Sequence, residues 1–168
     1  MSVHAYSRCW IHMIWATYNR ERMLFQEPAR KVSAYLYEYA RSKEIYMKIN
    51  FVNPDHVHAL IDLPRNLSIE EVAKLLKGSS SHWINQNRLL QGKFYWGRGY
   101  GAFSVSHSLV PEVSSYMASQ EEHHKRRTFR EELEQFVTRY GLEWREETVK
   151  TVNKGGDEDS NPLDESRG

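Results

Sequence analysis

The chain has 168 residues, of which 40% are hydrophobic and 27% are charged, a composition that supports one folded core. Residues 151–168 hold two basic and five acidic side chains, whereas the other 150 residues hold 21 basic and 17 acidic ones. A single cysteine excludes a disulfide framework, and no apolar stretch reaches the roughly 20 residues of a membrane-spanning helix. The first residues also lack a secretory signal pattern. We expect a cytoplasmic protein with one domain over residues 1–150 and an acidic, disordered tail over 151–168.

A strand and a helix are predicted near the start of the chain. Residues 7–17 are dense in aromatic and branched side chains, which indicates a strand with apolar residues on both faces. A helix should begin near Pro28, because proline suits the first turn. The helix carries one apolar stripe with the spacing i, i+3, i+4 and i+7, formed by Val32, Tyr35, Leu36 and Tyr39.

A hairpin is predicted next. Apolar side chains alternate with mostly polar ones in residues 45–52, at Ile45, Met47, Ile49 and Phe51. Alternation of this kind is typical of a strand with one buried face. The turn residues 53–55 follow, and residues 56–63 resume extended character.

The second half of the chain predicts a helix, a strand and two further helices. Ser68 is a natural N-cap with Glu71 at the third helical position, the pattern of a capping box. A strand is expected within residues 94–106, a helix over about 111–125, and a charged helix from there to Gly141.

The element order is β-α-β-β-α-β with additional C-terminal helices. This order predicts an α+β fold of the ferredoxin-like, split βαβ kind, built on an antiparallel sheet. Both early helices should cover the same face of the sheet. The other face then needs a partner, a ligand or a second subunit.

Two histidines lie two positions apart on the strand predicted over residues 56–63. His56 and His58 therefore project from one face, while Val57 points into the core. Two imidazoles placed in this way can bind one metal ion, although one such pair among eight histidines can also arise by chance. Asp55 either shapes the preceding turn or orients the His56 imidazole.

The helix predicted over 111–125 offers a second group of polar side chains. Tyr116, Gln120 and His124 follow one another at intervals of four and so share a helical face. The same spacing also fits an ordinary core stripe that includes Met117, with Gln120 at its solvated edge. Sequence spacing alone leaves both interpretations open.

Taken together, the two motifs resemble those of the HUH single-tyrosine transposases, the insertion-sequence and repeat-associated kind. The histidine–hydrophobic–histidine motif of that family matches residues 56–58, and its Y-x-x-x-Q helix matches residues 116–120. The similarity covers roughly residues 5–140, and the element order and the spacing between the motifs also agree.

The resemblance implies a specific chemistry. His56, His58 and Gln120 would hold one divalent cation, Mg²⁺ or Mn²⁺, with His124 as an alternative third ligand. Tyr116 would attack a phosphodiester in single-stranded DNA, join the enzyme to the 5′ phosphate and leave a free 3′ hydroxyl. Because a free tyrosine has a pKa near 10, a nearby cation is needed to favour the phenolate.

The resemblance also implies partners. The DNA would carry hairpin ends of a mobile element, and the protein would act as a homodimer whose tyrosine helix completes the partner's site in trans. Basic residues interleaved with aromatic ones are typical of single-strand binders, although a solvated helix face beside core aromatics gives the same pattern. The candidates for DNA contact are Lys74, Lys77, Arg88, Lys93 and Arg98.

Three other functions fit parts of the pattern. A related HUH nickase of replication or plasmid transfer would share the metal and the tyrosine. A non-catalytic ferredoxin-like module would bind nucleic acid without metal or covalent capture. A metal-dependent hydrolase using His56, His58 and His124 would release free product without a protein–DNA adduct.

Overall fold

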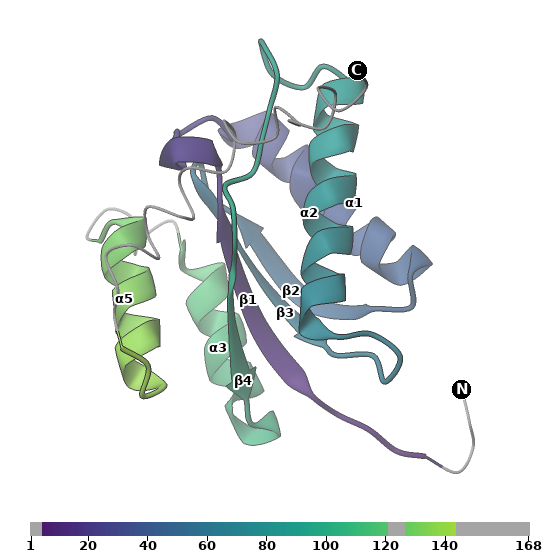
Figure 1. The fold of residues 1–168 in the computed structure, drawn as a ribbon, viewed down its shortest axis with the longest axis vertical. Helices are drawn as coiled ribbons and strands as arrows, with labels where there is room; N and C mark the ends of the chain where they lie inside the picture. Colours follow the sequence, from purple (N-terminus) through teal and green to yellow (C-terminus); the bar gives the residue numbers. More distant parts are fainter. Residues whose placement is uncertain (1–4, 121–126, 144–168) are drawn as a thin grey trace, which may run out of the picture.

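The computed structural model describes residues 5–120 and 127–143, so the acidic tail expected over 151–168 lies outside the described residues. Four strands form one antiparallel sheet in the order β2-β3-β1-β4 (Figure 1). The order confirms the split βαβ prediction. The elements that build this unit are β1 (Trp10–Ala16), α1 (Gln26–Ser42), β2 (Tyr46–Val52), β3 (His56–Asp62), α2 (Ile69–Gln86) and β4 (Gly101–Val105).

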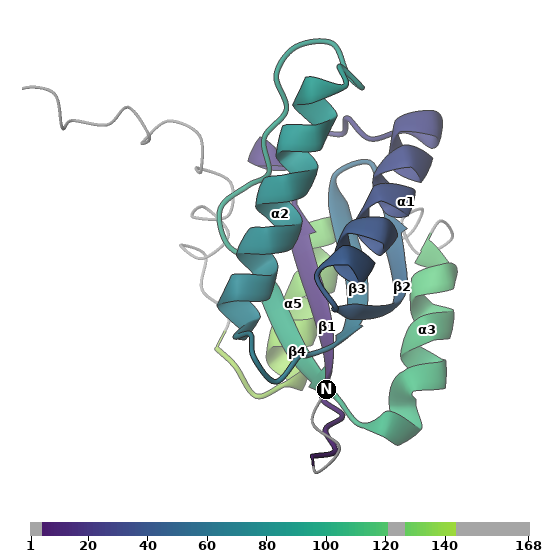
Figure 2. The same cartoon turned by 90° about the vertical axis from the view of Figure 1, so that its right-hand side faces the viewer.

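Helices cover both faces of the sheet. Figures 1 and 2 show α1 and α2 on one face, as predicted, and two later helices on the other. The face for which the sequence indicated a partner or ligand is thus covered by the chain itself. The covering helices are α3 (Val110–Ala118), which follows the short helix η2 (His107–Leu109), and α5 (Phe129–Arg139).

The central strand β1 is buried along its whole length, in agreement with its apolar pattern. Met13 and Trp15 pack in the core beneath α1 and α2, whereas Ile14 packs with residues of α5. Both faces of β1 are therefore covered within a single chain. Antiparallel pairing places Ala16, the last residue of β1, opposite His56, the first residue of β3.

A bulge in β2 breaks the alternation that the sequence predicts. The register with β3 shifts between Met47 and Ile49, so Met47 and Val52 face the core beneath α1 and α2. Ile49 and Phe51 instead pack on the opposite side of the sheet. The expected single apolar face of this strand is wrong, because one extra residue in a strand reverses the faces of all that follow.

The predicted helix starts and ends are confirmed in part. The Ser68 hydroxyl accepts a hydrogen bond from the Glu71 backbone N–H at 3.0 Å, which is the N-cap half of the predicted capping box of α2. α3 ends at Ala118 with Ser119 as its C-cap, so the helix predicted over 111–125 does not run unbroken from its first residue to Gln120. No helix within residues 5–120 and 127–143 is long and apolar enough to span a lipid bilayer.

Candidate active site

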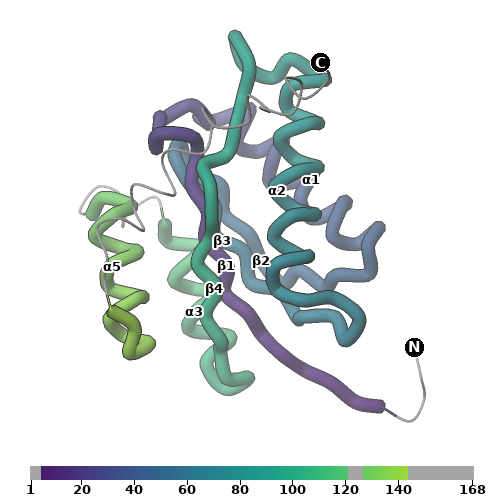
Figure 3. Tube along the Cα trace, in the orientation of Figure 1, coloured from purple at the N-terminus to yellow at the C-terminus, as the bar shows by residue number. Residues whose placement is uncertain are grey.

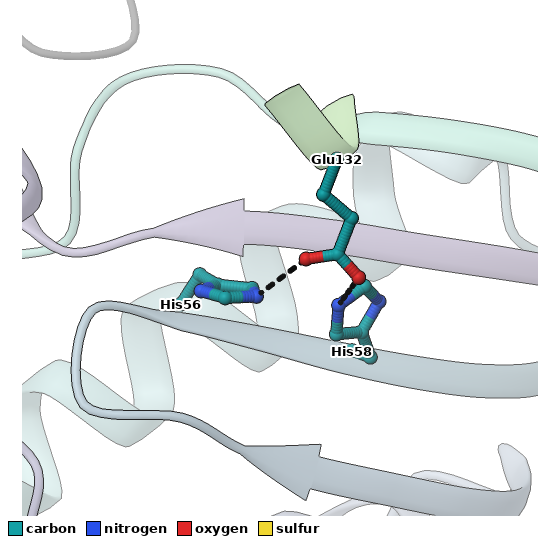
Figure 4. Close-up of side chains that lie close together, drawn as sticks. All are labelled: His56, His58 and Glu132. Carbon is teal, nitrogen blue, oxygen red and sulfur yellow. Dashed lines mark ion pairs between the residues drawn. The ribbon is translucent and has the colours of Figure 1, made fainter. Parts of the chain in front are cut away.

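The two histidines of β3 face α5. Both side chains are fully buried, and Val57 between them packs in the core on the other side of the sheet, as predicted. The strand fixes this arrangement, because successive side chains point to opposite faces. His56 and His58 thus project from the face of the sheet that α5 covers and point toward Glu132 of that helix (Figure 4).

A buried carboxylate meets both imidazoles. Glu132 Oε2 lies 3.2 Å from His56 Nε2, and Glu132 Oε1 lies 3.0 Å from His58 Nε2 (Figure 4). One donor atom from each of these three residues lies within 4.8 Å of the other two. Two imidazole nitrogens and a carboxylate oxygen form a donor set that suits a divalent cation, so the cluster could hold one.

Sequence reasoning missed Glu132. The residue lies on α5, where Phe129 and Leu133 pack against Ile14 and Phe103 and fix the helix on the sheet. A signal was present, because Glu132 follows Phe129 by three positions and so falls within the apolar stripe of this helix. A carboxylate in such a stripe is buried and needs a partner.

Each histidine is also held through its other ring nitrogen. Asp55 Oδ1 lies 2.7 Å from His56 Nδ1, and His12 Nε2 lies 2.8 Å from His58 Nδ1. These contacts leave the Nε2 atoms directed at Glu132. Asp55 therefore orients an imidazole, one of the two roles that the sequence allowed, and His12 of β1 is a second orienting residue that the sequence analysis did not identify.

Tyr116 and Gln120 lie against the same cluster. The Tyr116 hydroxyl donates a hydrogen bond to Glu132 Oε1, and its ring stands edge-on to His58 with centroids 5.9 Å apart. Gln120 is fully buried, its side-chain N–H donates to the Tyr116 backbone carbonyl at 3.4 Å, and the same side chain interacts with the His58 imidazole. All the predicted site residues of the two motifs therefore meet in one chain, and His124 lies outside the described residues.

Burial and hydrogen bonding act together on the charges of this site. Burial alone would raise the pKa of Glu132, but the hydrogen bonds from His56 and His58 hold it well below its usual range. Burial lowers the pKa of His58, and burial together with the Glu132 hydrogen bond raises the pKa of Tyr116. The site thus combines an ionised carboxylate with a protonated phenol.

An open groove leads to this cluster from the surface. It lies between α3 and α5, has a volume of about 1270 Å³, and is lined by Tyr116 and His12 among others. Arg127 and Arg139 also line it. The groove gives a ligand access to the Tyr116 side chain.

The five basic residues predicted to contact DNA have different surroundings. Lys74 is exposed, and its Nζ lies 3.7 Å from Oε1 of Glu70. The Lys77 ammonium instead donates to the carbonyls of Gly97 and Gly99 at 2.9 and 2.7 Å. Burial lowers the pKa of Lys77 to about 8. Lys77 therefore ties α2 to the segment that leads into β4, a role that the sequence did not predict.

The other three basic residues are exposed. Arg88 follows the end of α2, and Lys93 and Arg98 lie in the segment before β4. The Lys93 ammonium lies 5.3 Å from the centre of the Tyr95 ring.

Comparison with known proteins gives a consistent set of relatives. The model of the family described as "Transposase IS200 like" matches residues 5–120. The ISDra2 transposase TnpA of Deinococcus radiodurans is 27% identical over 114 residues, which are 65% of this chain and 81% of that protein. The transposase of insertion sequence IS200 from Salmonella typhimurium is 26% identical over 127 residues, which are 73% of this chain and 83% of that protein.

Solved structures show the same likeness. A crystal structure from Deinococcus radiodurans R1, described as a transposase, superposes with a TM-score of 0.58 and 25% identity over 71% of this chain and 96% of that one. A REP-associated tyrosine transposase bound to a REP hairpin superposes with a TM-score of 0.54 and 14% identity over 74% of both chains. The second likeness concerns the fold alone. Glu132 and the rest of α5 lie beyond the residues that the family model matches.

Proposed function

The chain belongs to the IS200-like transposase family, whose activity is DNA transposition, and from this premise we propose that it cuts and rejoins single-stranded DNA through a covalent phosphotyrosine intermediate. The observation that supports the proposal most directly is the contact of the Tyr116 hydroxyl with Glu132. The same carboxylate lies against both buried histidines. A nucleophile and a cluster suited to a divalent cation thus share one site.

Tyr116 is the proposed nucleophile. Its phenol oxygen attacks the scissile phosphorus, so a tyrosine–phosphate bond forms and the bond to the 3′ oxygen breaks. The enzyme is then joined to the 5′ phosphate, and the 3′ oxygen leaves as a hydroxyl. Attack by a 3′ hydroxyl on the phosphotyrosine reverses these changes, so rejoining needs no nucleotide cofactor.

The proposed cofactor is a divalent cation, Mg²⁺ or Mn²⁺, held by His56 and His58. We assign Glu132 as its third ligand and keep Gln120, which the family resemblance implies, as a further donor in contact with His58. When bound, the cation supplies positive charge that favours the phenolate and neutralises the reacting phosphate. Asp55 fixes the orientation of the His56 ring through its contact with Nδ1, which leaves Nε2 for the cation.

The proposed substrate is single-stranded DNA that carries the hairpin ends of a mobile element. The hairpin bound by the REP-associated neighbour supports this choice. Because Tyr116 and His58 of one chain already lie together, we propose that each site is complete in cis. A homodimer with sites completed in trans, which the sequence resemblance implied, is the competing arrangement.

Covalent capture tests the proposal. Labelled single-stranded DNA from the flanks of the gene is mixed with wild type, Tyr116→Phe and His58→Ala, with and without Mn²⁺, and separated on a denaturing gel. We expect an adduct that requires the metal and forms with wild type but not with Tyr116→Phe or His58→Ala. Tyr46→Phe is the matched control, because Tyr46 is 52% exposed and lies opposite Asp62, at the far end of β3 from His56.

Three results would contradict the proposal. An adduct that survives Tyr116→Phe places the nucleophile elsewhere. Release of cut DNA without any adduct identifies a hydrolase, and metal-independent binding without cleavage identifies a binding module.

A further inference from the structure

A ring-and-cation surface lies at the end of the sheet that holds the active site. It is formed by Tyr18, Lys93, Tyr95 and Arg98. Tyr18 belongs to the short helix η1 (Tyr18–Arg20), which begins two residues after the end of β1. The other three residues belong to the segment that leads into β4. Figures 1 and 3 show this segment running alongside the end of β1.

Buried and exposed side chains alternate in the segment before β4. Phe94 and Trp96 point inward and are buried, and the indole N–H of Trp96 donates to the Ser80 hydroxyl at 2.9 Å. Lys93 and Tyr95 alternate with them and point outward, and Tyr95 is 46% exposed. An extended backbone produces this alternation, so the two buried rings hold the segment in place beneath the exposed side chains of Lys93 and Tyr95.

Backbone hydrogen bonds join this surface to the catalytic cluster. The Tyr18 N–H donates to the Tyr95 carbonyl at 3.0 Å, and the Thr17 N–H donates to the Asp55 carbonyl at 2.8 Å. Asp55 in turn contacts His56. Tyr18 follows Ala16, the partner of His56, by two residues, which corresponds to about 7 Å of extended chain at most.

The side chains of this surface, of which Tyr18 is half-buried and the other three are exposed, suit a polyanion with flat bases. The rings of Tyr18 and Tyr95 meet at an angle of 67° with centroids 6.5 Å apart, and the Lys93 ammonium lies over the Tyr95 ring. Arg98 adds a second exposed cation to the same segment. Aromatic faces bind bases by stacking, and lysine and arginine bind the phosphates between them.

We propose that this ring-and-cation surface binds the single-stranded DNA segment that flanks the cleaved phosphate, with a base stacked on Tyr95 and phosphates bound by Lys93 and Arg98. The proposal rests on the proposed function and names where its substrate lies. The proposal assigns DNA contact to only some of the aromatic residues near α2. Trp83 stacks on Tyr35 with centroids 4.5 Å apart, and Trp96 is buried, so neither ring is presented to DNA in this way.

Binding measurements on the uncleaved complex test the proposal. The background variant is Tyr116→Phe, and the probe is a fluorescent thymidine oligonucleotide of about 16 nucleotides, the upper end of the site size for such binders. We expect Tyr95→Ala to weaken binding by about 5- to 150-fold, because one stacking contact is lost. Tyr95→Phe keeps the ring and should restore most of the affinity.

The salt dependence of binding separates the two kinds of contact. Lys93→Gln should lower the slope of log affinity against log salt by about 0.7, the value for one phosphate contact in a single strand. Tyr95→Ala should weaken binding without changing this slope. Tyr46→Ala and Lys48→Gln are the controls, because both residues are exposed and lie on the edge strand β2.

The outcomes distinguish this proposal from the proposed function. Unchanged affinity of Tyr95→Ala, or no binding of the oligonucleotide by the background variant, overturns the surface assignment. Covalent capture by the otherwise wild-type enzyme reports separately on the nucleophile and the metal. Normal capture together with unchanged affinity of Tyr95→Ala would therefore retain the transposase chemistry and reject only this surface.

Discussion

Asp55 and His56 are neighbours in sequence, and the Asp55 carboxylate lies 2.7 Å from Nδ1 of the His56 imidazole. Because this contact fixes the ring, we predict that Asp55→Ala weakens Mn²⁺ binding by about 10- to 100-fold, as is usual when such a partner is removed. Isothermal titration with Mn²⁺ measures the effect. Glu38→Ala, a change at an exposed carboxylate on α1, should bind Mn²⁺ as wild type does, and equal affinities of the two variants would contradict the assigned role.

Glu132→Gln tests the proposed metal ligand that the sequence analysis missed. The amide keeps the shape of the side chain but removes the charge that both histidines face. We therefore expect weaker Mn²⁺ binding and a smaller rise in melting temperature on adding Mn²⁺. Glu134→Gln on the same helix changes an exposed carboxylate and is the matched control. Full Mn²⁺ affinity in Glu132→Gln would return the third position to Gln120.

The fold was predictable because hydrophobic patterns and turn residues specify the sheet and its helices locally. The bulge in β2 was not, because the apolar side chains of Met47 and Ile49 fit a regular strand as well as a bulged one. Contacts between segments that are far apart in the sequence could not be predicted either. His12 and Glu132 are 120 positions apart. Pairing of β1 with β3 brings His12 to His58, and the packing of α5 on the sheet brings Glu132 there.

Mixing two inactive variants tests whether a site is complete within one chain. Tyr116→Phe lacks the proposed nucleophile and His58→Ala lacks a proposed ligand. Because Tyr116 contacts Glu132 and His58 of its own chain, we expect the mixture to form no covalent adduct. Recovery of capture in the mixture would show that the tyrosine helix serves a partner subunit.

Lys77 gives the stability of the protein a dependence on alkaline pH. Burial lowers its pKa from 10.5 to about 8, so between these values the unfolded chain binds more protons than the folded one. Stability should therefore rise with pH across this window, by at most about 3 kcal/mol. Urea unfolding of wild type and Lys77→Met at about pH 8 and about pH 10 isolates the contribution. If the difference in the free energy of unfolding between wild type and Lys77→Met stays constant with pH, the Lys77 ammonium is not the source of the pH dependence.

Gly101 of β4 pairs with Ile14 of β1. A Cβ atom there would lie 2.7 Å from Ile14 Cγ2 and 3.0 Å from the Phe103 ring. Ile14 is 1% exposed and branched, so it has little room to move, and we predict that Gly101→Ala lowers the free energy of unfolding by about 1–3 kcal/mol. Gly78→Ala is the opposite case, because no atom lies within 4 Å of the added carbon and the residue is inside α2. That change should stabilise the protein by about 0.5–1 kcal/mol through helix propensity. Urea unfolding measures the free energy of unfolding of both variants. Equal effects of the two changes would show that the lack of space around Ile14 does not determine the effect of Gly101→Ala.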